Sequence, residues 1–146
     1  MISIVPMKLI DLNAVYAIEK ECFSIPWSRE SLKAEITSNN IAIYIVAKKD
    51  SQVLGYAGMR HVVTEGHITN IAVKPEHQGR GVGEALLKEI IHIARKKNMV
   101  GLSLEARMGN RPAMNLYSKY GFKAEGIRKG YYSDTGEDAV VMWKDL

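Results

Sequence analysis

The sequence contains a single cysteine, Cys22, among 146 residues. One cysteine cannot form an intrachain disulfide, so the fold depends on a packed core, as is usual in a reducing compartment. No apolar run approaches the roughly 20 residues that a membrane-spanning helix needs. The N-terminus also lacks the basic stretch followed by an apolar one that marks a secretory signal. We therefore expect a cytoplasmic protein without a membrane partner.

Internal repeats, low-complexity tracts and linker-like segments are absent too. Hydrophobic residues make up 47% of the chain and charged residues 25%, which are ordinary values for a globular protein. A chain of this length can bury one sizeable core. We expect a single domain over residues 1–146.

The sequence also has no metal-binding pattern and no nucleic-acid-binding stripe. None of its four histidines (His61, His67, His77 and His92) has a histidine or cysteine partner at ligand spacing, so we expect no metal. The net charge is +4, but no basic stripe is interleaved with aromatic residues, so we expect no direct contact with nucleic acid. A polyanionic cofactor accounts better for the surplus positive charge.

The most informative pattern lies in the middle of the chain. An apolar run at 68–73 predicts a buried strand, and Pro75 ends it because proline has no amide hydrogen. The sequence QGRGVG follows at 78–83, and helical spacing comes after it. This order presents free backbone N–H groups and a positive helix-dipole end to one anion, with Arg80 as a mobile cation. The pattern indicates a phosphate-binding loop.

Two common phosphate-binding loops do not match this segment. A nucleotide P-loop requires Gly-Lys-Ser/Thr after the glycines, whereas this loop runs into Val82, Gly83 and Glu84. The dinucleotide fingerprint GxGxxG spaces its glycines differently. Six residues alone are equally compatible with a glycine-rich turn that binds nothing, so the neighbouring segments must decide.

Hydrophobic periodicity predicts the remaining elements. The predicted strands are at 2–5, 41–47, 52–63, 66–73, 102–107, 122–128 and 139–143, and the predicted helices are at 9–23, 28–38, 83–98 and 112–121. Glycines at 55 and 58 suggest close packing or a bulge, and residues 131–138 are expected to form a polar loop. The element order predicts an α/β fold, with a mixed, mainly antiparallel sheet of about seven strands and about four helices on both faces.

Several separated motifs resemble the GCN5-related N-acetyltransferases. They are the Q/R-x-x-G-x-G/A signature met by Gln78, Gly81 and Gly83, the run LEAR at 104–107, Asn110 with Ala113, and the run NLYSKYGF at 115–122. The end motifs FSIPWS at 23–28 and RKGYYSDTGEDA at 128–139 resemble the ribosomal-protein alanine N-acetyltransferases of that family. GHIT at 66–69 also fits the archaeal and eukaryotic Nα-acetyltransferases, so the acceptor stays open.

The resemblance covers nearly the whole chain and implies splayed central strands and acetyl-CoA as cosubstrate. It implies the N-terminal alanine of small-subunit ribosomal protein eighteen as the acceptor. The residues it assigns to the cofactor are Ile71, Ala72, Val73, Gln78, Gly79, Arg80, Gly81, Val82, Gly83, Asn110, Ala113 and Tyr117. Those it assigns to the acceptor are Trp27, Glu105, Tyr131 and Tyr132. Without it, Asn110 would be a helix cap and the aromatic residues ordinary packing.

Acetyl transfer to an amine sets chemical demands that two residues can meet. An α-ammonium group with a pKa of about 8 must lose a proton, and the leaving thiolate must gain one. The resemblance makes Glu105 the general base and Tyr117, whose phenol is neutral at pH 7, the general acid. A backbone N–H at 71–73 is the expected oxyanion donor. Considered alone, Glu105 would be a solvated strand residue and Tyr117 a core residue.

Other classes of function stay open at this point. One is acetylation of other protein N-termini, of lysine side chains or of a small amine. Another is a non-catalytic CoA-binding subunit of a larger assembly, which would need neither Glu105 nor Tyr117. We expect a monomer or a weak homo-oligomer, and we expect Cys22 to be a small buried residue, since direct transfer needs no acyl-cysteine.

Overall fold

The computed structural model describes all residues 1–146 and contains one seven-stranded sheet with four α-helices. The strands are β1 (Ser3–Pro6), β2 (Ala42–Lys49), β3 (Gln52–Val62), β4 (Glu65–Val73), β5 (Gly101–Arg107), β6 (Lys123–Tyr132) and β7 (Glu137–Asp145). The helices are α1 (Leu12–Cys22), α2 (Arg29–Thr37), α3 (Val82–Lys96) and α4 (Arg111–Lys119). Short 3-10 helices at Leu9–Asp11 and Pro75–His77 complete the set.

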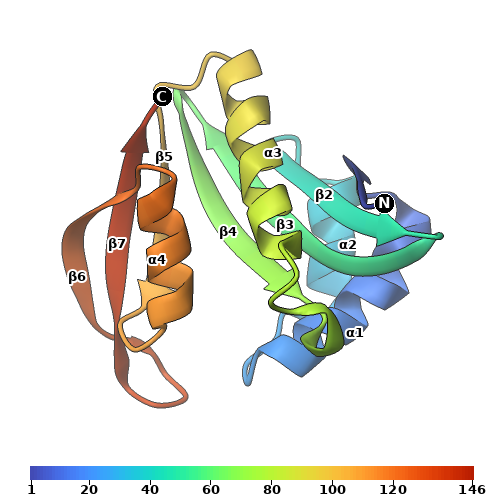
Figure 1. Ribbon diagram of the computed structural model, residues 1–146, viewed down its shortest axis with the longest axis horizontal. Coiled ribbons are helices and arrows are strands. Elements are labelled where there is room, and N and C mark those ends of the chain that lie inside the picture. Colours follow the sequence, from blue (N-terminus) through green and yellow to red (C-terminus); the bar gives the residue numbers. More distant parts are fainter.

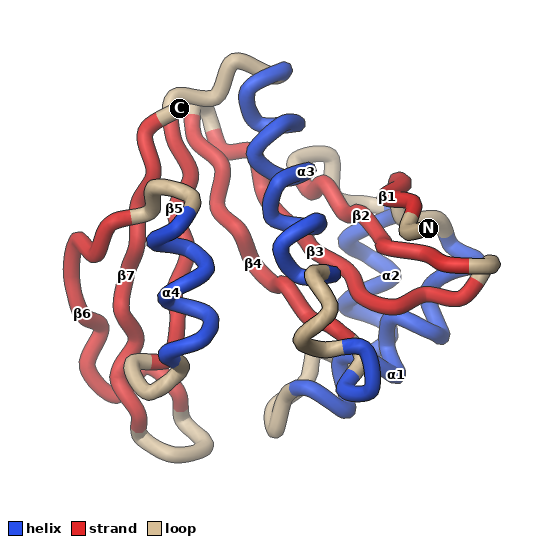
Figure 2. Tube along the Cα trace, viewed as in Figure 1, coloured by secondary structure: helices blue, strands red, loops and turns tan.

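The sheet is divided in the middle. Its strand order is β1-β2-β3-β4-β5-β7-β6, and all neighbours are antiparallel except β4 and β5. These two parallel strands pair only over three residues, where Glu65, Gly66 and His67 face 101–103. Beyond His67 they diverge, as Figures 1 and 2 show. We call β1–β4 with α1–α3 the N-terminal arm and β5–β7 with α4 the C-terminal arm.

A β-bulge lies at the point where β4 leaves β5. Gly58 of β3 pairs with Asn70 and the next residue, Met59, pairs with Ile68, so Thr69 is an extra residue in β4. A bulge bends its strand and redirects the side chains around it. Gly58 is required here because a Cβ atom would lie 2.5 Å from the Tyr44 ring. The close packing predicted from the glycines is therefore confirmed at Gly58, and the bulge at this point lies opposite it in β4.

Helices cover both faces of the sheet. On one face, α1 and α2 bury Leu12, Val15 and Leu32 against the strands of the N-terminal arm. On the other face, α3 buries a stripe that includes Leu86 and Ile90, and α4 lies over the C-terminal arm (Figure 1). This stripe follows the three- and four-residue spacing of a helix with one apolar side. No helix has both the length and the apolar character that crossing a membrane requires.

The predicted α/β class, strand number and two-sided helix cover are confirmed, but most boundaries shift by one or more residues and two assignments differ in kind. The helix expected at 9–23 begins with a separate 3-10 turn. The loop expected at 131–138 is wrong at both ends, because Tyr131 and Tyr132 belong to β6, and Glu137 and Asp138 belong to β7. Tyr132 pairs with Glu137 across the hairpin, because aromatic residues suit a pleated strand even beside turn-forming residues. The turn itself is only 133–136.

Candidate active site

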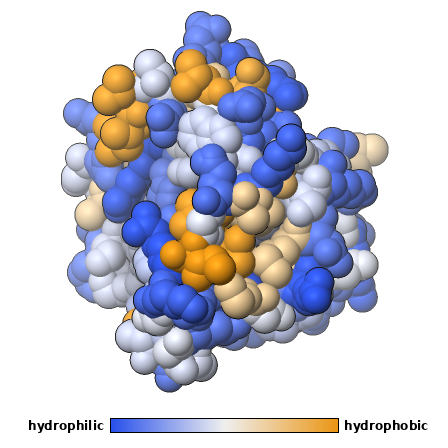
Figure 3. All heavy atoms as spheres, turned by 90° about the vertical axis from the view of Figure 1, so that its left-hand side faces the viewer, coloured by the Kyte–Doolittle hydropathy of each residue, from blue (hydrophilic) through white to orange (hydrophobic).

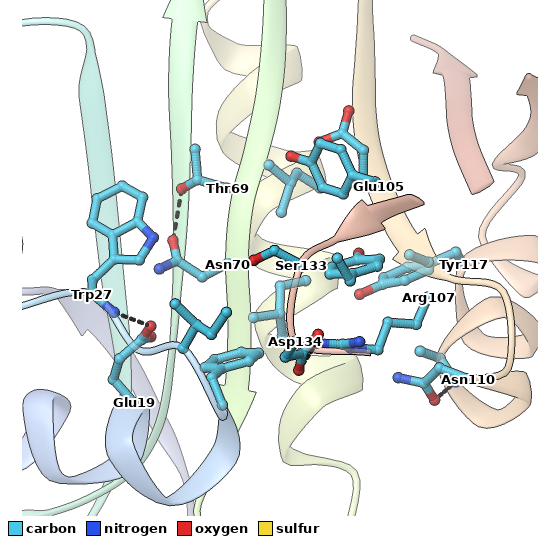
Figure 4. A pocket seen from close by; sticks show the side chains of 18 residues that line it. Glu19, Trp27, Thr69, Asn70, Glu105, Arg107, Asn110, Tyr117, Ser133 and Asp134 are labelled. Carbon is cyan, nitrogen blue, oxygen red and sulfur yellow. Dashed lines mark hydrogen bonds and ion pairs between the residues drawn. The ribbon is translucent and has the colours of Figure 1, made fainter. Parts of the chain in front are cut away.

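A cavity of about 430 Å³ opens where the two arms separate (Figure 4). Both arms and the chain segment between α1 and α2 contribute to it. Its lining consists of Glu19, Phe23, Ile25, Trp27, Ile68, Thr69, Asn70, Ile71, Glu105, Ala106, Arg107, Asn110, Ala113, Tyr117, Tyr131, Tyr132, Ser133 and Asp134. The carboxylates of Glu19, Glu105 and Asp134 outnumber the one basic lining residue, Arg107. An acidic lining suits an ammonium group better than an anion.

Glu105 lies near the middle of β5 with only 12% of its side chain exposed. Its neighbours Leu104 and Ala106 point into the core on the opposite face, so strand alternation directs Glu105 into the cavity. One carboxylate oxygen lies 3.2 Å from His67 Nε2 and the other 3.7 Å from Arg128 Nε. This carboxylate is placed to accept a proton from a group in the cavity.

Tyr117 projects into the same cavity from α4. Asn110 caps this helix, since its Oδ1 accepts a hydrogen bond from the Ala113 N–H at 3.3 Å. The Tyr117 ring packs edge-on against Phe122, with centroids 5.9 Å apart. Burial, with a further contribution from Tyr132, raises the pKa of Tyr117 to about 12. The phenol therefore keeps its proton at neutral pH and can donate it to a basic leaving group.

Aromatic residues form a wall of the cavity. The rings of Tyr131 and Tyr132 meet at 89° with centroids 5.0 Å apart, and the Arg107 guanidinium lies 4.0 Å from the Tyr132 centroid. Trp27 is fixed from the N-terminal arm, because its backbone N–H donates to Glu19 Oε2 at 2.9 Å. Burial raises the pKa of that Glu19 carboxyl.

A polar contact joins the two arms beside the cavity. Ser24 Oγ, in the segment between α1 and α2, donates to Asp134 in the β6–β7 turn. Arg107 Nη2 donates to the same carboxylate at 2.8 Å. The Ser24 hydroxyl, followed by Arg107, holds the pKa of Asp134 at about 2. Segments far apart in the sequence thus close one side of the site.

The glycine loop lies outside the cavity, at the start of α3. Gly79 and Gly81 have φ values of +77° and +81°, which L side chains rarely adopt. The first α3 amide in a hydrogen bond to the loop is Ala85 N–H, which donates to Gly81 O at 3.0 Å. The preceding amides, including those of Val82 and Gly83, therefore have no helical acceptor. Together with the positive dipole end of this 15-residue helix, these amides fit a diphosphate.

The free edge of β4 connects this loop with the cavity. Past His67 the edge that faces β5 has no strand partner, so its backbone groups can bind an extended ligand. Ile71 lines the cavity, whereas the side chain of Ala72 is buried in the core on the α1 side. Val73 O already accepts hydrogen bonds from Cys22 Sγ at 3.2 Å and Gln78 Nε2 at 3.1 Å. Cys22, expected to be buried, is only half-buried because it lies in the last turn of α1, and it is away from the cavity lining.

The structure thus brings half of the predicted site residues together in one cavity. The cavity collects Trp27, Ile71, Glu105, Asn110, Ala113, Tyr117, Tyr131 and Tyr132. The remaining predicted cofactor residues, Ala72, Val73, Gln78, Gly79, Arg80, Gly81, Val82 and Gly83, lie along the strand end and the glycine loop.

Sequence reasoning missed several lining residues. Glu19, Ile25, Arg107 and Asp134 were not predicted, although the last three belong to motifs that carried the family resemblance. Their position inside these motifs is the feature of the sequence from which their place in the cavity could have been predicted. No group of three or more histidine, cysteine, aspartate or glutamate side chains is arranged to hold a metal ion.

Comparisons with known proteins identify the class. Residues 12–122 match the model described as the Acetyltransferase (GNAT) family, so the chain belongs to that family. It is an acetyl-CoA-dependent N-acetyltransferase, and the family resemblance read from its motifs is confirmed.

Its similarity to particular members extends along almost the whole chain. A Bacillus subtilis (strain 168) protein, provisionally assigned as a ribosomal protein bS18-alanine N-acetyltransferase, is 44% identical over 94% of this chain and 91% of that protein. The Escherichia coli (strain K12) ribosomal protein bS18-alanine N-acetyltransferase is 32% identical over 96% and 95%. The crystal structure of the Escherichia coli ribosomal-protein-S18-alanine N-acetyltransferase superimposes with a TM-score of 0.92 at 31% identity, covering 100% of this chain and 94% of that one.

Proposed function

We propose that this enzyme acetylates the N-terminal alanine of ribosomal protein bS18 by direct attack of the α-amino group on acetyl-CoA. The observation that carries the proposal is the placement of Glu105 and Tyr117. They come from β5 and α4 but line one cavity, whose acidic and aromatic lining suits a peptide that begins with an ammonium group. The similarity to the bS18-specific relatives supports this choice of acceptor.

The cofactor would lie along the N-terminal arm. Backbone amides of 79–83, with Arg80 beside them, would hold the diphosphate at the start of α3. The free edge of β4 at 71–73 would hydrogen-bond the pantetheine amides, and Asn110 and Ala113 would contact the cofactor from α4. Acetyl-CoA supplies an activated thioester, and a backbone N–H at 71–73 would stabilise the charge that develops on its oxygen.

The acceptor would enter between the aromatic residues. Trp27, Tyr131 and Tyr132 would form the walls around the first residues of the peptide. Glu105 would take a proton from the α-ammonium group, directly or through one water. Tyr117 would give its proton to the leaving sulfur, a role that fits a phenol with a pKa of about 12. Both groups act in a half-buried site, where charge interactions are stronger than in water.

A peptide panel with measured CoA release tests the proposal. We expect turnover with a bS18 N-terminal peptide that begins with alanine, and none after its α-amino group is blocked. Lysine-containing peptides with blocked N-termini and small amines should be poor acceptors. Preference for one of these would contradict N-terminal specificity, and no turnover with any acceptor would favour a binding-only subunit. Substitution of the alanine by bulky first residues would show whether other protein N-termini are equally good.

Glu105→Gln separates the chemistry from binding. The amide cannot accept the proton, so the variant should work only at high pH, where the amine is already neutral. We expect the pH–rate profile to move to higher pH with an unchanged KM for acetyl-CoA. An unchanged profile would exclude Glu105 as the base.

A further inference from the structure

Three neighbouring side chains lead out of the active-site cavity, joined by one close acid–imidazole contact and one hydrogen bond. His67 Nε2 lies 3.2 Å from Glu105 Oε1, and His67 Nδ1 lies 2.9 Å from Ser103 Oγ. His67 and Ser103 face each other in the last β4–β5 pair before the arms separate. Two different strands therefore fix the imidazole at the closed end of the split.

The outer end of this series of side chains opens to solvent away from the cavity. His67 and Ser103 are not cavity-lining residues. They line a separate groove of about 340 Å³, with 62–66 forming the rest of it. The His67 side chain is 36% exposed, three times the 12% of Glu105. Glu105 thus faces the cavity, and the imidazole connects it with water on the other side.

Proton balance makes such a connection useful. An ammonium acceptor and a thioester yield an amide, a thiol and one free proton, because the acceptor nitrogen loses two protons and the sulfur gains one. Glu105 must release this proton before the next turnover. Acetyl-CoA and the peptide would occupy the cavity side, so a route that does not cross the cavity is needed.

Resting on the function proposed above, we propose that His67, assisted by Ser103, is the proton outlet of Glu105. The protonated carboxyl gives its proton to Nε2, and the imidazolium releases the Nδ1 proton to Ser103 or to groove water. Ring-proton exchange with water then restores the tautomer with a free Nε2. Histidine suits this task because its ordinary titration range lies nearest neutral pH. His67 is a positioning and relay residue that acts through Glu105 and does not touch the reacting atoms.

Among the charged and titratable groups near Glu105, only His67 can carry its proton towards solvent. Arg128 Nε approaches the second Glu105 oxygen at 3.7 Å, but a guanidinium neither accepts nor gives up a proton at neutral pH. Tyr131 lies on the cavity side, and burial and the Glu105 charge raise its pKa, so it stays protonated. Glu65 lines the outer groove, where it can receive protons released from the imidazole.

Chemical rescue tests the outlet. His67→Ala should lower kcat by about 10- to 100-fold, less than the loss of a general base, and leave the KM for acetyl-CoA unchanged. Added imidazole should enter the groove and restore turnover, and a series of substituted imidazoles should show rates that depend on their pKa. The solvent deuterium isotope effect on kcat should also be larger in this variant.

Two control variants distinguish a proton-relay role of His67 from a purely structural role. His67→Asn keeps a hydrogen-bonding group but cannot change protonation, so it should lose turnover with an unchanged unfolding midpoint. His92→Ala, an exposed position on α3, should have normal turnover and no response to imidazole. The proposed proton outlet would be refuted if His67→Ala had normal turnover, or if added imidazole did not restore its lost turnover.

The same assay distinguishes this failure from failure of the proposed function. A wild-type enzyme that does not acetylate the peptide would refute the function itself. A wild-type enzyme that is active and depends on Glu105 but not on His67 would refute only the relay.

Discussion

The two arms of the sheet are built differently. In the N-terminal arm, 44–47 of β2 and 53–59 of β3 are buried without interruption. In the C-terminal arm, β6 is exposed over 123–131 and α4 has no fully buried residue. On the side of the molecule where β6 lies, apolar atoms form separate patches among hydrophilic ones (Figure 3). The strands β5 and β7 still contribute buried residues such as Leu102 and Leu104 to the same core as α3. The lightly packed elements of the C-terminal arm are therefore β6 and α4, the helix that carries Tyr117.

The difference in packing suggests that the two arms contribute differently to stability and to activity. The strands and helices of the N-terminal arm are held by apolar packing, which determines the free energy of unfolding. In the C-terminal arm, β6 and α4 bury little apolar surface, and polar contacts with the other arm include Ser24 with Asp134 and Glu84 with Lys119. Substitutions in the two arms should consequently have separable effects.

The largest expected effect is on turnover, from Tyr117→Phe in the C-terminal arm. Loss of the general acid should lower kcat by about 10²–10⁴-fold. The free energy of unfolding should hardly change, because the raised pKa of Tyr117 has burial and Tyr132, not a hydrogen bond, as its causes. Steady-state kinetics and urea unfolding of the same preparations check both points. A parallel rise in KM for acetyl-CoA would count against the acid role.

Leu86→Ala in the N-terminal arm should have the next largest effect, on stability. Leu86 is fully buried on α3, and removing such a side chain typically costs about 2–5 kcal/mol. Leu116→Ala on α4 is the matched control, because this side chain is only half-buried. Urea unfolding should give a clearly smaller loss for Leu116→Ala. Equal losses would contradict the contrast between the arms.

Tyr44 and Tyr117 allow a comparison of the arms at alkaline pH. Burial is the main cause that raises both pKa values to about 12. A pKa raised in the folded state means that its contribution is fully present below about pH 10 and is lost as pH rises towards 12. A difference of two in pKa corresponds to about 2.7 kcal/mol. Tyr44→Phe should therefore show a shallower decline in unfolding free energy between pH 9 and 11 than the wild type. An identical decline would refute this assignment.

Sequence reasoning succeeded where local pattern and motif agree. The alternation of Leu104, Glu105 and Ala106 predicted a strand with one polar face, and the helical spacing after the glycine loop predicted the helix that begins there. These features are determined by residues that are close together in the sequence, so they can be predicted from it. The family motifs then placed Glu105 and Tyr117 in one site before any geometry was known.

Contacts between distant segments could not be predicted in the same way. His67 showed no partner at metal-ligand spacing, yet it lies between Ser103 and Glu105, 36 and 38 residues later. Ser24 and Asp134 are 110 residues apart and meet only because the hairpin folds back over the split. Tyr131 and Tyr132 were assigned to a loop because the turn residues after them dominated the local signal, whereas cross-strand pairing decides the outcome.

The smallest expected effect concerns the contact that ties the arms together on the α3 side. Glu84 Oε2, near the start of α3, accepts hydrogen bonds from Lys119 Nζ at 2.7 Å and from the Tyr120 hydroxyl at 2.5 Å. All three side chains reach solvent, so Glu84→Gln should destabilise the protein less than Leu116→Ala does. The Lys119 contribution is an ion pair and should disappear in 1 M NaCl, where the screening length is about 3 Å.

Tyr120→Phe is the matched variant for this contact. It removes the neutral hydroxyl but keeps the ion pair between Glu84 and Lys119. Thermal unfolding in low and high salt should therefore give a salt-dependent loss for Glu84→Gln and a salt-independent loss for Tyr120→Phe. Since the contact joins α3 to the end of the helix that carries Tyr117, Glu84→Gln should also lower turnover slightly. If α4 were packed as closely as α3, Glu84→Gln would leave turnover unchanged.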